Sequence, residues 1–253
     1  MSISNEFKKR LLAGETLIGS WCMAGSASIV ETMGWTGFDF LTIDGEHGPY
    51  SPADILDSLR AIAGTPSLPV VRTPGHDATY IKRLLDIGAQ TLLVPMVETA
   101  DQAKAIVAAT RYPPAGTRGF ALMHRASRYL QVEDYAHVAN DHICIVAQLE
   151  SPGAIDRLEE IATVPGIDAV FIGPGDLSAA MGLLGQPTHE DVLSIMKEAA
   201  SRCARIGVPC GTLFNRADVA RRCLEFGYTM VAVGSDLAFL ANSARALAQS
   251  MKQ

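Results

Sequence analysis

Short apolar runs alternate with helix-like patterns eight times along this chain. The strand-like runs lie at 16–23, 38–44, 68–73, 91–95, 143–149, 169–173, 208–213 and 228–233. The helical patterns lie at 26–36, 51–63, 77–88, 99–110, 153–163, 189–206, 216–227 and 236–251. Apolar runs of this length, separated by helices, are typical of parallel strands that are buried on both faces. Eight such units predict the α/β class and a (β/α)8 barrel.

The segments outside this alternation are few. A short amphipathic helix near 4–13 precedes the first strand and is expected to cap the floor of the barrel. The alternative architecture, a doubly wound sheet, should carry a Gly-rich phosphate-binding fingerprint after the first strand, and Met23-Ala-Gly-Ser-Ala27 is not one. A long stretch from Tyr112 to His142 is predicted to serve an active site or an interface. No linker is evident, so we expect one domain over residues 1–253.

Composition narrows the class of protein. Hydrophobic residues make up 48% of the 253 residues and charged residues 19%, which is normal for a globular protein. A net charge of −6 argues against nucleic acid and anionic membranes as partners. No apolar run approaches the roughly 20 residues of a membrane helix. The N-terminus lacks a signal-peptide pattern, and the five cysteines lack CxxC spacing. We therefore expect a cytoplasmic protein with reduced cysteines.

Two of the apolar runs end in a carboxylate. Glu150 follows the fifth strand, and Asp176 follows the sixth. Neighbouring strands lie about 4.8 Å apart, and barrel active sites lie at the carboxyl ends of the strands. Two carboxylates that close repel each other unless a cation or a shared proton lies between them. The pair therefore predicts a metal site. Gln148 is two residues before Glu150 and faces the same side of its strand.

The other strand ends supply the groups for a reaction. Asp44 and His47 follow the second strand, and Arg72 ends the third. No lysine lies at a strand end, because all six fall in predicted helices or termini: Lys8, Lys9, Lys82, Lys104, Lys197 and Lys252. A Schiff-base mechanism needs a lysine in the pocket, so the metal is expected to stabilise the enolate of a 2-oxo acid instead.

Oxygen ligands favour Mg²⁺ or Mn²⁺ over zinc. Arg72 would add positive charge over the substrate oxygens. His47, oriented by Asp44, is the predicted acid/base. The backbone N–H groups at Gly175 and Asp176 would bind the substrate carboxylate.

A structural alternative stays open for each of these residues. Glu150 and Asp176 are also suited to cap helices at strand–helix junctions. Arg72 is also suited to a structural ion pair inside the barrel mouth. Glu46 competes with Asp44 as the partner of His47.

Six segments of this chain together resemble the HpcH/HpaI aldolases, which are class II pyruvate aldolases of the 4-hydroxy-2-oxoheptanedioate aldolase type. The segments are 37–47, 71–72, 93–98, 114–119, 148–150 and 171–178. The resemblance implies a (β/α)8 barrel whose C-terminal helix is exchanged between neighbours in a homohexamer, a trimer of dimers. It also implies reversible cleavage of 4-hydroxy-2-oxo acids to an aldehyde and pyruvate, or a related 2-oxo acid such as hydroxypyruvate. Such enzymes serve the catabolism of aromatic compounds or sugar acids.

The same resemblance assigns roles to individual residues. It implies Glu150 and Asp176 as ligands of a divalent cation (Mg²⁺, Mn²⁺ or Co²⁺), with Gln148 lining the site. It implies Arg72 as the clamp on pyruvate, and His47 with Asp44 as the acid/base. Gly175 is a departure, since relatives often carry alanine there.

Acceptor specificity is expected to rest on Leu213 and Phe214 at the end of the seventh strand, and on residues 120–130 of the same or a neighbouring subunit. Two other functions stay open: a coenzyme A thioester lyase of the citrate lyase β-subunit or malyl-CoA type, and a barrel that only binds a 2-oxo acid.

Overall fold

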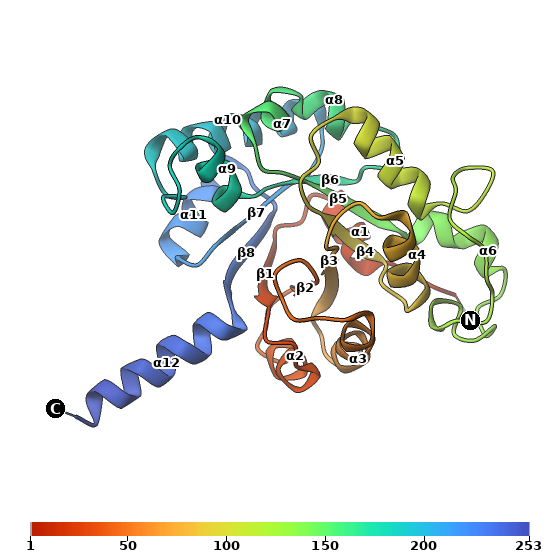
Figure 1. The fold of residues 1–253 in the computed structure, drawn as a ribbon, viewed down its shortest axis with the longest axis horizontal. Helices are drawn as coiled ribbons and strands as arrows, with labels where there is room; N and C mark the ends of the chain where they lie inside the picture. Colours follow the sequence, from red (N-terminus) through yellow and green to blue (C-terminus); the bar gives the residue numbers. More distant parts are fainter. Residues whose placement is uncertain (1, 253) are drawn as a thin grey trace.

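The computed structural model describes residues 2–252, and this part of the chain forms an α/β barrel (Figure 1). Eight parallel strands pair in sequence order, and the last pairs with the first, so the sheet is closed. The strands are β1 Leu17–Cys22, β2 Phe40–Asp44, β3 Leu68–Arg72, β4 Thr91–Val94, β5 Cys144–Leu149, β6 Ala169–Ile172, β7 Cys210–Phe214 and β8 Met230–Ser235. The predicted (β/α)8 barrel is confirmed, with strand bounds within two residues of those expected.

Most of the helices surround this sheet, whereas the first closes its floor and the last extends away from it (Figure 1). The helices are α1 Glu6–Leu12, α2 Ala27–Gly34, α3 Pro52–Ile62, α4 Ala78–Asp86, α5 Ala100–Thr110, α6 Tyr135–Val138, α7 Pro152–Asp156, α8 Leu158–Ala162, α9 Pro174–Ala180, α10 Glu190–Ile206, α11 Ala217–Phe226 and α12 Asp236–Ser250. The single helix predicted at 153–163 is interrupted at Arg157, whose backbone leaves the helical region (φ −95°, ψ 16°). The sequence pattern also missed α9 and α6, which are too short to show a helical period.

Helix ends follow the predicted local chemistry. Ser51 caps α3 through its side chain, which accepts from the backbone N–H of Asp54, and Pro52 occupies the first turn. Gly207 and Gly227 end α10 and α11 with positive φ, a conformation that glycine adopts without steric cost. These stops return the chain to the floor of the barrel, where the next strand begins.

The interior of the barrel is filled with side chains. Phe7 of α1 packs edge-on against Phe40 of β2, with ring centroids 5.5 Å apart, and so closes the floor as predicted. Nearer the mouth, Trp21 of β1 packs edge-on against Phe171 of β6. Burial of this many large apolar groups drives closure of the sheet. The solid interior leaves room for a ligand only at the two ends of the barrel.

The long stretch after α5 lies at the floor, because it connects a helix to the next strand. It contains two 3₁₀ turns, η1 Arg125–Ser127 and η2 Ala139–His142, and the short helix α6. Three consecutive non-glycine residues, 128–130, have positive φ. Within one chain this segment is therefore far from the strand ends that carry the predicted site. The prediction that it serves the active site is not confirmed within one chain.

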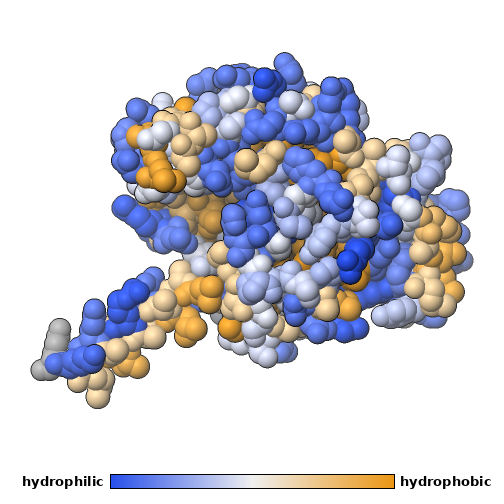
Figure 2. Space-filling model, viewed as in Figure 1, coloured by the Kyte–Doolittle hydropathy of each residue, from blue (hydrophilic) through white to orange (hydrophobic). Residues whose placement is uncertain are grey.

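Helix α12 extends away from the barrel as a separate arm (Figure 1). It carries exposed apolar side chains, among them Leu240 (62% exposed), Leu247 (66%) and Met251 (80%). Figure 2 shows apolar residues near the start of this arm, where it leaves the body. The arm is held at its base, where the buried carboxylate of Asp236 accepts from the backbone N–H groups of Met23 and Ala24. None of the described helices is long and apolar enough to cross a membrane.

Candidate active site

A cavity of about 400 Å³ opens at the carboxyl ends of the strands. The sequence-predicted site residues all line it: Asp44, His47, Arg72, Gln148, Glu150, Gly175, Asp176 and Leu213. They come from β2, β3, β5, β6 and β7 and the loops that follow them. Residues up to 169 positions apart in the sequence thus meet because parallel strands end at the same rim.

Arg72 is the most tightly held side chain of the cavity. Its Nε and Nη2 donate to the two carboxylate oxygens of Asp44 at 2.9 and 2.7 Å, across the register pair of β2 and β3. Its Nη1 lies 2.8 Å from Oε2 of Glu46. The guanidinium lies over the ring of Trp21, 4.2 Å from its centroid. Since a bidentate pair fixes the plane of an arginine, Arg72 is preorganised at the cavity wall.

The contacts of Asp44 differ from its predicted role, which was to orient the ring of His47. Its buried carboxylate accepts from Arg72 and from the backbone N–H groups of Glu46 and His47, at 3.1 and 3.2 Å. Among the described residues, no side-chain hydrogen bond to the His47 imidazole is present, and His47 is exposed at the cavity mouth. Asp44 therefore fixes the turn that carries His47, not its ring. Glu46, the competing partner, binds Arg72; burial raises its pKa, and the charges of Arg72 and His47 oppose that rise.

Glu150 is a buried carboxylate with few partners. It accepts from the backbone N–H of Met96 at 3.0 Å and from Nε2 of Gln148. Burial raises its pKa to about 7, against these two hydrogen bonds, and the charges of Asp176 and Glu46 add to the rise. Gly173 lies directly against it, since a Cβ at that position would be 2.3 Å from Oε1 of Glu150. A side chain at position 173 would therefore displace this carboxylate.

The donor set around Glu150 suits a hard divalent cation. Asp176 lies in the first turn of α9, exposed to the cavity, and Oε1 of Gln148 is buried without a hydrogen-bond partner. Over residues 2–252, no group of three or more His, Cys, Asp or Glu side chains is placed to hold an ion. Two carboxylates and an amide oxygen match Mg²⁺ or Mn²⁺, which keep their other coordination positions for water and substrate. The residues present therefore fit the expected metal.

Three contributors to the site were not expected from the sequence. Trp21 lies under Arg72 at the end of β1, a strand whose end carried no predicted site residue; applying the strand-end rule to the first strand would have found it. Glu46 was left between two roles and binds Arg72. Met96 contributes only a backbone N–H, presented by its positive φ of 55°. No sequence pattern signals such a non-glycine conformation.

Comparison with known proteins identifies the group to which the chain belongs. The family model described as HpcH/HpaI aldolase/citrate lyase matches residues 17–243. The 4-hydroxy-2-oxo-heptane-1,7-dioate aldolase of Salmonella paratyphi A is 47% identical over 97% of this chain and 94% of its own. The 2-dehydro-3,6-dideoxy-6-sulfogluconate aldolase of Pseudomonas putida is 44% identical over 93% and 92%.

A solved structure agrees with these sequence matches. The HpcH/HpaI aldolase/citrate lyase family protein from Burkholderia cenocepacia J2315 superposes with a TM-score of 0.95 at 38% identity, covering 99% of this chain and all of that one. Both curated relatives are aldolases, which confirms the predicted enzyme class, a carbon–carbon lyase. The chain belongs to the HpcH/HpaI aldolase/citrate lyase family.

Proposed function

We propose that this protein is a metal-dependent class II aldolase that cleaves 4-hydroxy-2-oxo acids into an aldehyde and pyruvate or a closely related 2-oxo acid. Its main support is one arrangement: the acid pair Glu150 and Asp176 lines the same cavity as Arg72. No lysine is present among the lining residues of this cavity. The enolate must therefore be stabilised by something other than a Schiff base. A divalent cation held by the acid pair would do this.

Arg72 is suited to hold the oxygens of the 2-oxo acid. An arginine has five N–H donors, and Asp44 and Glu46 occupy three of them. One N–H on each Nη remains for the substrate. Because the guanidinium is already fixed, it would stabilise the enolate oxygen without reorganising.

The cation would be held by Glu150 and Asp176, with Gln148 beside them. When bound, it would supply positive charge at the keto oxygen and so stabilise the developing enolate. Glu150 would stay ionised in its presence, because an adjacent positive charge favours the carboxylate. We propose Mg²⁺ or Mn²⁺ as the ion, with Co²⁺ as a substitute of similar coordination.

His47 is the proposed acid/base. Its exposed position at the cavity mouth lets it exchange protons with water, and the Asp44 carboxylate fixes the turn on which it lies. In the cleavage direction a base tied to His47 would take the proton of the C4 hydroxyl. In the exchange reaction of pyruvate it would take a proton from C3.

The outer part of the cavity suits an acceptor chain that ends in an anion. Leu213 and Phe214 of β7 give it an apolar wall, and Arg216 lies at its rim. Both curated relatives are named for substrates with a terminal acid group, a carboxylate or a sulfonate. We therefore propose that Leu213 contacts the aldehyde carbon chain and that Arg216 attracts its terminal anion. In Arg216→Gln, KM for a dioate substrate should rise about tenfold, while KM for a neutral aldehyde acceptor should not change.

Exchange of the pyruvate methyl protons for deuterium in D₂O tests the proposed chemistry. The exchange should need a divalent cation, stop in EDTA and resume when Mn²⁺ is added. It should fall at least 10²-fold in Arg72→Ala, the size typical for loss of a preorganised donor. Exchange that continues in EDTA would exclude the metal role, and unchanged exchange in Arg72→Ala would exclude the clamp.

The assembly is a separate proposal. The apolar side chains that α12 exposes are expected to pack against a neighbouring copy, with the exchanged helix completing a homohexamer. Light scattering on the eluted protein should then give a mass six times that of one chain. A truncation before Leu237 should give a smaller species.

A further inference from the structure

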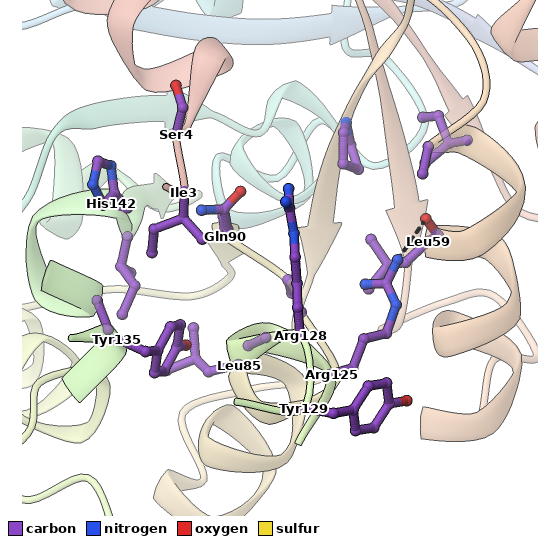
Figure 3. A pocket seen from close by; sticks show the side chains of 18 of the residues that line it. Ile3, Ser4, Leu59, Leu85, Gln90, Arg125, Arg128, Tyr129, Tyr135 and His142 are labelled. Atoms are coloured by element: carbon purple, nitrogen blue, oxygen red, sulfur yellow. Dashed lines mark hydrogen bonds between the residues drawn. The ribbon is translucent and has the colours of Figure 1, made fainter. Parts of the chain in front are cut away.

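A second cavity, of about 370 Å³, lies at the floor of the barrel, at the opposite end from the candidate active site. The segment between α5 and β5 covers it, and Ile3 and Ser4, which precede α1, reach its edge (Figure 3). Its volume falls within the range of small-molecule sites. No residue lines both cavities.

The lining of this floor cavity is strongly basic. It includes Arg118, Arg125, Arg128 and His142, and none of its lining residues is an aspartate or a glutamate. The lining itself brings no carboxylate to these guanidinium groups, and the nearby carboxylate of Asp86 pairs with Arg118. In Figure 3 the side chain of Arg128 runs along the middle of the cavity, between Gln90 and Arg125.

Arg118 lies behind the wall of the floor cavity. It is 2% exposed, and its Nη2 donates to Oδ1 of Asp86 at 2.6 Å. Its guanidinium lies over the ring of Tyr112, 4.4 Å from the centroid, and beside the side chain of Tyr135. Arg118 therefore contributes a buried positive charge that Asp86 partly offsets, and not a donor that a ligand in the cavity can reach.

Arg125 is fixed at the wall of the floor cavity. Its two Nη groups donate to the backbone carbonyls of Ile87 and Leu59, at 3.0 and 3.2 Å. Burial lowers the pKa of its guanidinium, and the positive charges of Arg60 and Arg128 lower it further. The side chain thus lies in a positive field that an anion would relieve.

The opposite wall of the floor cavity is apolar. Leu59 and Ile62 of α3, Leu85 of α4 and Ile143 before β5 line it. A bare inorganic ion would leave this wall unused. The site therefore fits an anionic head group attached to a small apolar body.

We propose that the floor cavity is a second ligand site, which binds a small organic anion (a carboxylate or a phosphate ester) through Arg125 and Arg128. The apolar body of the ligand would lie against Leu59 and Leu85. Because the barrel interior is packed solid, a ligand bound there acts on the molecule from the floor and does not take part in the reaction at the mouth.

Binding of phenyl phosphate and of benzoate, followed by isothermal titration calorimetry, tests this proposal and separates the two anion classes. Saturating pyruvate and Mg²⁺ are present so that the cavity at the mouth is filled. One further molecule of probe should bind per chain, and inorganic phosphate should bind more weakly than phenyl phosphate. Absence of binding of both organic probes at millimolar concentration would overturn the proposal.

A substitution series at Arg128 assigns the site. Lys, Gln and Glu are unbranched and tolerate its positive φ about equally, so the series changes charge and not backbone strain. Probe affinity should fall slightly in Arg128→Lys, by about tenfold in Arg128→Gln and further in Arg128→Glu. The matched control is Arg205→Gln, which removes an exposed arginine of α10 outside both cavities.

The control decides between a local and a general charge effect. Affinity that is unchanged in Arg128→Gln, or that falls equally in Arg205→Gln, would overturn the proposal. Thermal unfolding of each variant shows whether it is folded, and Arg128→Lys, which keeps the charge, serves as the second variant if the others unfold. Failure of pyruvate to bind would refute the proposed function but would leave this test intact.

Discussion

Replacement of Gly173 by alanine should displace the Glu150 carboxylate and remove most of the aldolase activity. The backbone of Gly173 (φ −89°, ψ 98°) lies in a region open to alanine, so the substitution adds no backbone strain. The new Cβ would be 2.3 Å from Oε1, 2.8 Å from Cγ and 3.0 Å from Cδ of Glu150. The first distance is about 1 Å short of van der Waals contact, and the carboxylate is the group that must move.

The magnitude follows from that displacement. A misplacement of about 1 Å in a catalytic group costs on the order of 10²-fold in rate. Moving Glu150 also strains its hydrogen bond to the N–H of Met96, and the crowding should lower the free energy of unfolding by about 1 to 3 kcal/mol. We expect kcat/KM to fall about 10²-fold and the affinity for Mn²⁺ to fall by at least about tenfold.

The assay couples released pyruvate to NADH oxidation by lactate dehydrogenase, and Mn²⁺ binding is followed by electron paramagnetic resonance. Gly75→Ala is the matched control, since its Cβ would meet no atom within 4 Å and the residue lies outside both cavities. It should keep wild-type activity. If Gly173→Ala keeps both its activity and its Mn²⁺ affinity, the close approach of backbone to Glu150 has no role in the site.

Three further changes test other parts of the structure. In Asp44→Asn the charge of Arg72 loses its main partner, so the free energy of unfolding in urea should fall by about 3 kcal/mol; a loss under about 1 kcal/mol would show that Glu46 alone holds the guanidinium. Dialysis against EDTA should lower the melting temperature as well as the activity, because removal of the cation leaves Glu150 and Asp176 without a neutralising charge. Equal melting curves with and without Mn²⁺ would refute this. The hydrogen bonds from Arg202 lower the pKa of Glu159 to about 2, so this contact stabilises the fold above the unfolded pKa of about 4.3 and is lost as pH falls through about 2. Arg202→Gln should therefore be less stable than wild type at pH 7, with a difference that shrinks below about pH 4; a difference independent of pH would contradict the contact.

The barrel and the set of site residues were predictable from the sequence because both depend on local signals. Apolar runs mark buried strands, and glycines such as Gly207 and Gly227 mark where helices end. Once the strands are known, parallel pairing in a barrel brings Glu150 and Arg72 to one rim without further information.

The pairings within the site were not predictable in the same way. The sequence predicted His47 as the partner of Asp44, whereas the register of β2 against β3 places Arg72 opposite it. The approach of Gly173 to Glu150 and the positive φ of Met96 depend on loop conformations that several sequences adopt. The stretch at 112–142 is recognisable in the sequence as unusually long. Its position at the floor follows from its place between a helix and the next strand, and its composition gives no sign of that position.

If α12 packs against a neighbouring copy, as proposed above, the active form of this protein depends on its concentration. Among the described residues, the first part of α12 holds the helix to its own barrel. Asp236 binds the end of β1, and Phe239 stacks on Phe38. Gly234 and Ser235 just before the helix line the active-site cavity. By mass action, dilution below the dissociation constant of the assembly would return the apolar side chains of the arm to water. The strand end at its base would then lose an anchor at the wall of the cavity. Specific activity should therefore decline on dilution and recover on concentration, a behaviour that a self-contained barrel would not show.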